Sequence, residues 1–187
     1  MIIDKKGIKK DNGKRNGVLY LQNEENARIR HTILKKVEPF SDEDLNQKPS
    51  ESEWSAMQIL DHLQKIETTI AEGVARAAKK NEQKKAWKKP IQLSVSRKVK
   101  VDAPKHTVPE EHYFTLDEMK KKLNSSRNRL YEVFASADAE ILKNNSMPHP
   151  VFGDVPLVQW FPFVGYHEKR HLSQLEQTLR KIDENKK

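Results

Sequence analysis

The sequence predicts an all-α protein: a four-helix bundle with a long basic connection between its second and third helices. Apolar residues recur at spacings of three and four in four separate segments, which is the period of an amphipathic helix. Two of these segments open with a capping box, in which a serine or threonine precedes a glutamine or glutamate by three residues. The sequence shows no convincing sheet pattern. Four helices of about 20 residues each therefore favour a bundle.

The composition indicates one domain without disulfides. The chain has 187 residues, of which 35% are hydrophobic and 33% charged, and it contains no cysteine. Without cysteine there is no disulfide, no cysteine-ligated zinc or iron–sulfur cluster, and no thiol nucleophile of the protein's own. The longest apolar stretch, 157–166, is about half the length of a membrane span, and the N-terminus lacks the apolar core of a secretory signal. We therefore expect a cytoplasmic protein with no membrane partner.

The net charge of +8 is concentrated in two segments of the chain. Residues 1–15 carry a net charge of +4 and residues 79–105 carry +8, so the remaining residues are mildly acidic. We expect residues 1–17 to form a flexible basic arm, residues 18–183 to form the bundle, and residues 184–187 to form a tail. The basic segment contains Trp87 and can be read as a nucleic-acid contact. A solvated loop is the interpretation we favour, because no nucleic-acid-binding fold is recognisable.

The first two helices are predicted from their apolar stripes and their ends. The first runs over residues 18–37 and ends before Pro39. The second starts at the N-cap Ser55, with Gln58 completing the capping box and Trp54 placed to staple against Ile59. Its inward stripe includes one histidine, His62. The stripe consists of Ile59, His62, Leu63, Ile66, Ile70, Val74 and Ala77.

Residues 81–114 form either a long loop or a crossover, in which 91–102 alternates apolar and polar residues like a hairpin or an extended strand. The third helix begins at Thr115 with Glu118 in its capping box, and its apolar face extends to Ile141. The fourth helix is expected to begin with Asp154 as its N-cap and Pro156 in its first turn. Pro162 should kink that helix or delay its regular start.

Three histidines are predicted to face the interior of the bundle. His167 and His171 are four residues apart, so they leave the same face of the fourth helix one turn apart, within its apolar stripe. His62 lies on the inward stripe of the second helix. Three neutral imidazoles can hold a divalent ion and leave a coordination position open. The alternative is that they are core histidines with ordinary hydrogen-bond partners. Glu168 does not complete the H-E-x-x-H pattern of zinc proteases, because the spacing here is H-E-K-R-H.

Two stretches of the chain resemble the signature segments of the DinB/YfiT-like superfamily. They are W-S-A-M-Q-I-L-D-H-L at 54–63 and the segment 149–175, which ends in H-x-x-x-H-L-x-Q-L. The resemblance extends over residues 18–182. It implies a four-helix bundle that binds a divalent metal through three histidines, which correspond here to His62, His167 and His171. Characterised members are described as metal-dependent hydrolases or as S-transferases of low-molecular-weight thiols, including bacillithiol and mycothiol.

The resemblance and the residues together predict a metal-dependent enzyme acting on a small electrophilic molecule. Such an enzyme would be a thiol S-transferase or a hydrolase, with a thiol or water activated at the metal. Zinc is the metal we expect, and nickel, iron and manganese also accept imidazole ligands. The partners would be the small-molecule substrate, a low-molecular-weight thiol and, since helix faces remain exposed, a second copy in a homodimer. The alternatives are a non-catalytic metal- or ligand-binding protein and a nucleic-acid-associated protein. Arg170 and Gln174 are placed to meet an anionic cosubstrate or to form surface contacts, and His149 is placed to stabilise a turn.

Overall fold

Four long helices make up most of the chain in the computed structural model, which describes residues 12–97 and 102–186, with side chains from residue 23 onward. The long helices are α1 (Asn12–Val37), α3 (Ala56–Lys80), α4 (Leu116–Ser136) and α6 (Trp160–Glu184). Shorter elements join them: α2 (Asp42–Asn46), α5 (Ala139–Asn144), the 3₁₀ helices η1 (Ile91–Val95), η2 (Lys105–Thr107) and η3 (Leu157–Gln159), and the strands β1 (Ser146–His149) and β2 (Gly153–Pro156). No helix in this described part combines the length and apolarity needed to cross a bilayer.

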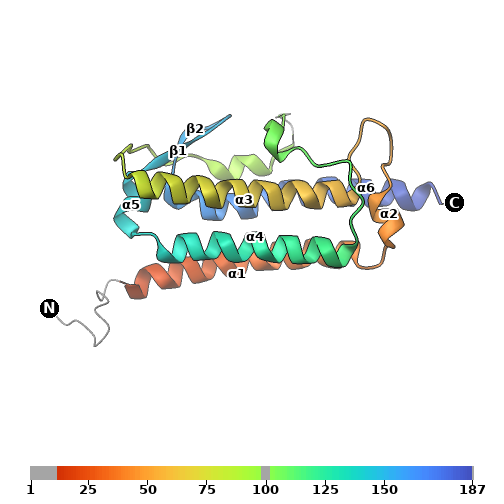
Figure 1. Cartoon of the computed structure of the whole chain (residues 1–187), viewed down its shortest axis with the longest axis horizontal. Coiled ribbons are helices and arrows are strands. Elements are labelled where there is room, and N and C mark those ends of the chain that lie inside the picture. The colour runs from red at the N-terminus through yellow and green to blue at the C-terminus, as the bar shows by residue number, and fades with distance from the viewer. Residues whose placement is uncertain (1–11, 98–101, 187) are drawn as a thin grey trace.

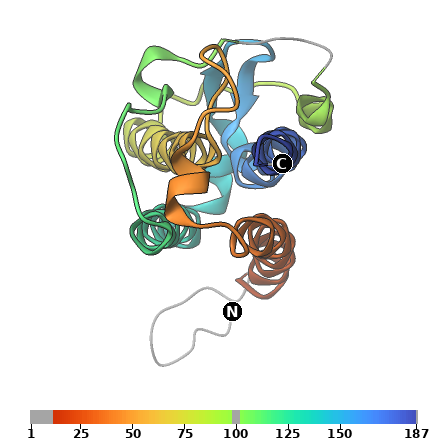
Figure 2. The same cartoon turned by 90° about the vertical axis from the view of Figure 1, so that its right-hand side faces the viewer.

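The four long helices form a bundle in which neighbours in sequence are not always antiparallel. Helices α1 and α6 run in one direction, and α3 and α4 run in the other (Figure 1). Seen end-on, α3 and α6 lie on one side of the bundle, and α4 and α1 lie on the other (Figure 2). Because α3 and α4 are parallel, their connection must return along the full length of a helix. This requirement explains the long segment between Lys80 and Leu116. The sequence left open whether that segment is a long loop or a crossover, and the parallel directions of α3 and α4 show that it is a crossover.

The predicted starts of α3 and α4 are confirmed. Ser55 Oγ accepts the backbone N–H of Gln58 at 3.1 Å, and the Gln58 side chain accepts the N–H of Ser55 at 3.0 Å. Thr115 and Glu118 form the same reciprocal pair at the start of α4. Each box satisfies N–H groups that have no partner within the helix. A third box, at Ser41, starts the short helix α2, which the sequence analysis did not predict.

The expected start of the fourth long helix was wrong in its position. Asp154 and Pro156 belong to strand β2, and the regular helix α6 begins only at Trp160, after η3. Pro162 is therefore the third residue of α6. Its missing N–H is one of those that have no partner in a first turn, so it delays the helix without kinking its interior.

The structure contains a hairpin that the sequence analysis did not predict. Strands β1 and β2 pair antiparallel, with Met147 opposite Val155. The sequence pattern did not indicate these strands, because Pro148 and Pro150 are residues that disfavour a strand assignment. The alternating stretch at 91–102 was the expected candidate, but its residues 91–95 form the 3₁₀ helix η1, with Ile91 buried.

Two other boundaries differ from the expectation. Helix α4 ends at Ser136, so Ile141 lies on the separate helix α5. The N-cap of α5, Asp138, accepts the N–H groups of Glu140 and Ile141 and starts a new helix. At the other end of the chain, α1 begins at Asn12, so residues 12–17 of the expected arm are helical. Residues 1–11 lie outside the described residues.

The apolar core consists of two clusters at opposite ends of the bundle. One contains Ile70, Val74, Leu130, Phe134, Phe161 and Val164, and the other contains Ile33, Val37, Leu60, Leu63, Leu123 and Leu175. Each of α3, α4 and α6 passes from one cluster to the other. Polar residues occupy the turn in between, at Glu67 on α3, Arg127 on α4 and Glu168 on α6. The bundle is thus divided by a buried polar layer.

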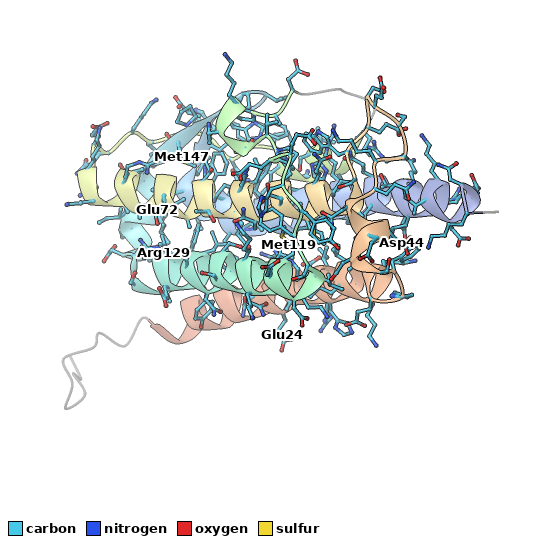
Figure 3. The ribbon with its side chains drawn as sticks, turned by 45° about the vertical axis from the view of Figure 1, so that its right-hand side comes forward. Glu24, Asp44, Glu72, Met119, Arg129 and Met147 are labelled. Carbon is cyan, nitrogen blue, oxygen red and sulfur yellow. The ribbon has the colours of Figure 1, made fainter. Side chains whose placement is uncertain are left out.

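A glycine in the interior of α6 allows α1 to approach closely. A Cβ atom on Gly165 would lie 2.2 Å from Asn26 Oδ1. Asn26 is buried and donates from Nδ2 to the carbonyl of Phe161 at 3.0 Å, so its side chain is held in place. Gly73 on α3 is similar, since a Cβ there would lie 2.4 Å from Met147 Sδ, but the obstacle is the end of a flexible side chain (Figure 3).

We expect Gly165→Ala to destabilise the protein and Gly73→Ala to stabilise it slightly. Both changes gain about 1 kcal/mol of helix propensity. At position 165 overpacking costs about 1–3 kcal/mol, because Asn26 cannot move without losing its bond to Phe161, whereas Met147 can adopt another rotamer. Urea unfolding of the two variants measures the difference. Equal free energies of unfolding for the two variants would show that α1 and α6 can move apart at Asn26 and Gly165 at little cost.

Candidate metal centre

The fold brings His62, His167 and His171 together between α3 and α6. One potential ligand atom from each lies within 4.8 Å of the others. The ring centroids are 5.3 Å apart for His62 and His167, 4.8 Å for His62 and His171, and 4.5 Å for His167 and His171. The spacing of four residues places the α6 pair on one face, and that face meets the inward stripe of α3.

The ring of His62 is held in one orientation by the long connection. Its Nδ1 lies 2.8 Å from the carbonyl oxygen of Thr107, at the end of η2. Because a carbonyl only accepts, Nδ1 carries the proton and Nε2 is left as the nitrogen available to a metal. Thr107 is itself buried, and its hydroxyl donates to the carbonyl of Pro104 at 2.8 Å. The ring also packs against Trp54, with centroids 5.0 Å apart.

His171 is oriented in the same way from within its own helix. Its Nδ1 lies 2.9 Å from Oε1 of Gln174, one turn further along α6. The amide oxygen accepts, so Nδ1 donates and Nε2 again remains for a ligand. His62 and His171 are only 3% and 9% exposed, whereas His167 keeps part of its surface accessible.

The surroundings keep all three imidazoles neutral. Burial lowers the pKa of His62, although the Thr107 carbonyl offsets part of the effect. Burial, and then the proximity of His171 and His62, lowers the pKa of His167 well below its usual range. Burial, reinforced by His62, lowers the pKa of His171 to about 3. Neutral imidazole is the form that binds a metal, so no proton has to be removed at pH 7.

The donor set and the spacing fit a divalent metal ion. Two of the three rings present an oriented Nε2, and the second ring nitrogen of each is bonded as is usual for metal-binding histidines. In a tetrahedral zinc site with bonds of about 2.0–2.1 Å, two ligand nitrogens lie about 3.4 Å apart. Ligand atoms up to 4.8 Å apart therefore have to move toward one another by about 1.4 Å, which small rotations of the imidazole rings can supply. The three histidines can hold a metal ion.

The long connection is anchored to both helices that carry the histidines. On α3, the Asp61 carboxylate accepts the N–H of Glu110 at 3.2 Å, and Lys65 Nζ donates to the Val108 carbonyl at 3.1 Å. On α6, Arg170 Nη1 donates to the backbone carbonyl of Ser96. These anchors flank the histidines in the sequence of each helix. Arg170 and Gln174 therefore have contacts within the protein: Arg170 binds the connection, and Gln174 orients His171.

The other singled-out residues do not join the three histidines. His149 stabilises the hairpin turn as expected, since its Nδ1 accepts the N–H groups of Val151 at 3.0 Å and Phe152 at 3.3 Å. His31 is exposed on α1. Glu168 follows His167 directly, but its carboxylate binds Arg30 and Arg127 in the centre of the bundle. It does not occupy the position of a general base beside the three imidazoles.

Sequence reasoning missed Thr107, which orients His62, and the buried charges at the centre of the bundle. Thr107 acts through its backbone carbonyl, so no side-chain pattern identifies it. The buried charges of the polar layer did leave a signal: Glu67, Arg127 and Glu168 each stand four residues after an apolar core residue, inside an otherwise apolar stripe. A charge at such a position is rarely left unpaired, so these positions predict partners for one another.

Comparison with known proteins identifies the family of the chain. The sequence profile of the DinB superfamily matches residues 25–175 of the chain. The chain belongs to the DinB superfamily. A Bacillus subtilis (strain 168) protein, described as uncharacterized protein YuaE, is 38% identical over 148 residues, which cover 79% of this chain and 91% of that protein. The four-helix bundle fold is also seen in the crystal structure of TT2238, described as a four-helix bundle protein. It matches with a TM-score of 0.58 at 20% identity, covering 85% of this chain and 98% of the other.

The stability of this DinB-superfamily protein without metal should fall between pH 7 and pH 5. An unfolded histidine has a pKa of about 6.5, above the value of about 3 for folded His171. Below pH 6.5 the unfolded chain therefore binds more protons than the folded one. The free energy of unfolding is at its full value above pH 6.5 and decreases by about 1.4 kcal/mol per pH unit for each such imidazole.

Urea unfolding in the presence of a chelator measures this dependence. We expect His171→Asn to have a shallower slope between pH 6.5 and pH 5 than the wild type. The exposed His31 provides the control, and His31→Asn should keep the wild-type slope. Parallel curves for the wild type and His171→Asn would contradict the assignment of a depressed pKa to His171.

Proposed function

We propose that this protein is a divalent-metal-dependent enzyme acting on a small electrophilic molecule, by thiol S-transfer or by hydrolysis. The observation that carries the proposal is the convergence of three neutral imidazoles, two of them oriented through Nδ1 so that Nε2 is free. A site that existed only to stabilise the core would be served by apolar residues. Three nitrogen ligands leave at least one coordination position for a substrate or water, as in catalytic metal sites.

The residues of the site support two versions of this chemistry. A divalent ion bound there would act as a Lewis acid that favours the deprotonated form of a thiol or of water. His62, His167 and His171 would hold it, while Thr107 and Gln174 keep two of the rings in the binding orientation. The chain has no cysteine, so in the transferase version the sulfur must come from a low-molecular-weight thiol. Zinc is the metal we propose, because imidazole ligands suit it.

Metal content tests the first part of the proposal. We expect about one divalent ion per chain in protein purified without a metal-affinity tag, measured by elemental analysis. His167→Ala should lose it, because two imidazoles remain where three are needed. His106→Ala is a matched control, since His106 is exposed and adjoins Thr107 on η2 without belonging to the site. A wild-type protein without metal and without zinc affinity would refute the proposed metal site.

Turnover assays test the second part. The metal-loaded protein is incubated with an electrophile such as an alkyl halide or an epoxide, with and without bacillithiol, mycothiol or another small thiol. Thiol consumption matched to the loss of electrophile, and abolished in His167→Ala, would establish the transferase version. Product formation without a thiol would establish the hydrolase version. Binding of metal without turnover of any such substrate would support a non-catalytic metal-binding protein instead.

A further inference from the structure

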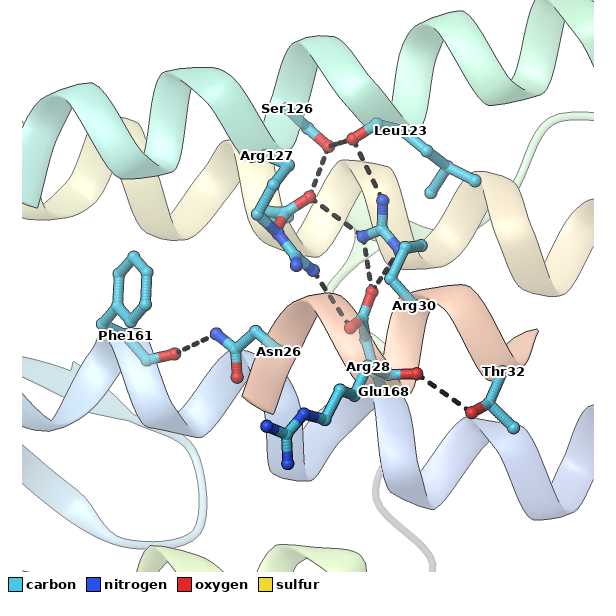
Figure 4. A network of polar contacts seen from close by, with 10 residues as sticks. Asn26, Arg28, Arg30, Thr32, Leu123, Ser126, Arg127, Phe161 and Glu168 are labelled. Carbon is cyan, nitrogen blue, oxygen red and sulfur yellow. Dashed lines mark hydrogen bonds and ion pairs between the residues drawn. The ribbon is translucent and has the colours of Figure 1, made fainter. Parts of the chain in front are cut away.

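Four buried charged residues meet at the centre of the bundle, and each of the four long helices supplies one of them. Arg30 lies on α1, Arg127 on α4 and Glu168 on α6 (Figure 4), and Glu67 lies on α3. Their side chains are between 1% and 13% exposed. Two arginines and two glutamates make the group electrically neutral. We call these four residues the charge ring.

Each glutamate in the charge ring binds both arginines. Glu67 binds Arg30 at 3.1 Å through Oε2 and binds Arg127 Nε through Oε1. Glu168 binds Arg30 Nε at 2.5 Å through Oε1 and Arg127 Nη2 at 3.0 Å through Oε2. The glutamates of α3 and α6 are thus joined twice, through an arginine of α1 and through an arginine of α4.

Two further bonds fix the position of the charge ring along α4. Arg30 Nη1 donates to the backbone carbonyl of Leu123 at 3.0 Å, and Ser126 Oγ donates to Glu67 Oε2 at 2.5 Å. The carboxylate oxygens and the guanidinium groups therefore have several directional partners each. Among the described residues, no fully buried side-chain nitrogen or oxygen lacks a hydrogen-bond partner.

The two glutamates of the charge ring and the three histidines lie on the same two helices, α3 and α6, within about one and a half turns of one another. Glu168 follows His167 directly and precedes His171 by one turn, and Glu67 follows His62 by five residues, about 7.5 Å along α3. The α3 and α6 glutamates point to the centre, and the histidines lie where α3 meets α6. A shift of α6 along α3 would therefore change the distances within both groups together.

The apolar clusters on either side cannot set this register as sharply. Packing between apolar side chains is non-directional, and cores accept rearranged packing at modest cost. A shift of one helical turn moves a residue by 5.4 Å, which would break every bond that Glu168 makes to the two arginines. A buried polar group is known to fix helix register in this way in coiled coils.

We propose that the charge ring is the positioning device of the metal centre: it holds α3 and α6 in the register at which His62, His167 and His171 converge. This inference rests on the proposed metal binding of the three histidines. Arg127 gives the sharpest test, because α4 contributes no histidine to the centre. Arg127 binds Glu67 and Glu168, which lie on the two helices that bear the ligands, so its effect on metal binding reports how these glutamates position the helices.

The experiment compares zinc binding by Arg127→Lys and Arg127→Met with binding by the wild type. Lysine keeps a positive charge beside the two buried carboxylates, so Arg127→Lys should fold more readily than Arg127→Met. Its single ammonium group cannot reproduce the bonds from Nε and Nη2 to two carboxylates. Binding of zinc chloride is measured by isothermal titration calorimetry, at a temperature where circular dichroism shows each protein to be fully folded. We expect zinc affinity about 10-fold to 100-fold weaker in both variants, the range seen when groups that orient ligands are removed.

A surface ion pair between α4 and α3 provides the matched control. Arg129 Nε on α4 binds Glu72 Oε1 on α3 at 2.9 Å, and both side chains are nearly half exposed (Figure 3). Arg129→Lys and Arg129→Met should bind zinc as the wild type does.

The outcomes separate this inference from the proposed function. Wild-type affinity in folded Arg127→Lys, together with a lower free energy of unfolding, would overturn the inference, because the charge ring would then stabilise the bundle without positioning the ligands. Absence of zinc binding by the wild type would overturn the metal centre itself. If Arg127→Met does not fold, Arg127→Lys still decides the question.

Discussion

The buried charge ring of Arg30, Glu67, Arg127 and Glu168 is the interaction on which the arrangement of the four helices depends. Each helix supplies one charge, and the four charges have good geometry only when all four helices are in place. Removing one member of a buried ion pair leaves the other charge uncompensated and costs about 3–5 kcal/mol. Alternative packings of the same apolar stripes are therefore disfavoured by the loss of these bonds.

The charge ring also explains why the apolar core is divided. A bundle of this length could bury one continuous core, yet here the apolar residues form two clusters with a polar layer between them. That layer contains the charge ring at the bundle centre and the three imidazoles between α3 and α6. Burial of the two apolar clusters stabilises the bundle, and directional hydrogen bonds and ion pairs fix the geometry of the polar layer between them.

The second constraint on the centre is the connection between α3 and α4. The two helices are parallel, so the chain has to cross the length of the bundle between them, and it does so beside the histidines. Its backbone supplies the carbonyl of Thr107 to His62 and receives bonds from Lys65 and Arg170. The basic segment within 79–105 leads into this docked part of the chain. The topology thus places a long loop where it can orient a ligand.

The sequence by itself determined the helices and the identity of the histidines. Periodicity and capping boxes are local properties, so α3 and α4 could be predicted to the residue at their starts, and the side of the helix on which His62, His167 and His171 lie followed from spacing alone. The start of α6 and the hairpin before it were not predictable in this way. Prolines obscured the strands, and the pairing of β1 with β2 depends on contacts outside either strand.

Only the tertiary structure decided the order of the helices, the partners of the histidines and the pairing within the charge ring. Glu67 and Glu168 are about a hundred residues apart, and their shared arginines come from two other helices. Thr107 contributes a main-chain atom, which every residue possesses, so its role has no trace in the residue type. These contacts depend on which helix faces pack against one another in the bundle. The helical period shows which face of a helix is buried, but it does not show which other helix packs against that face.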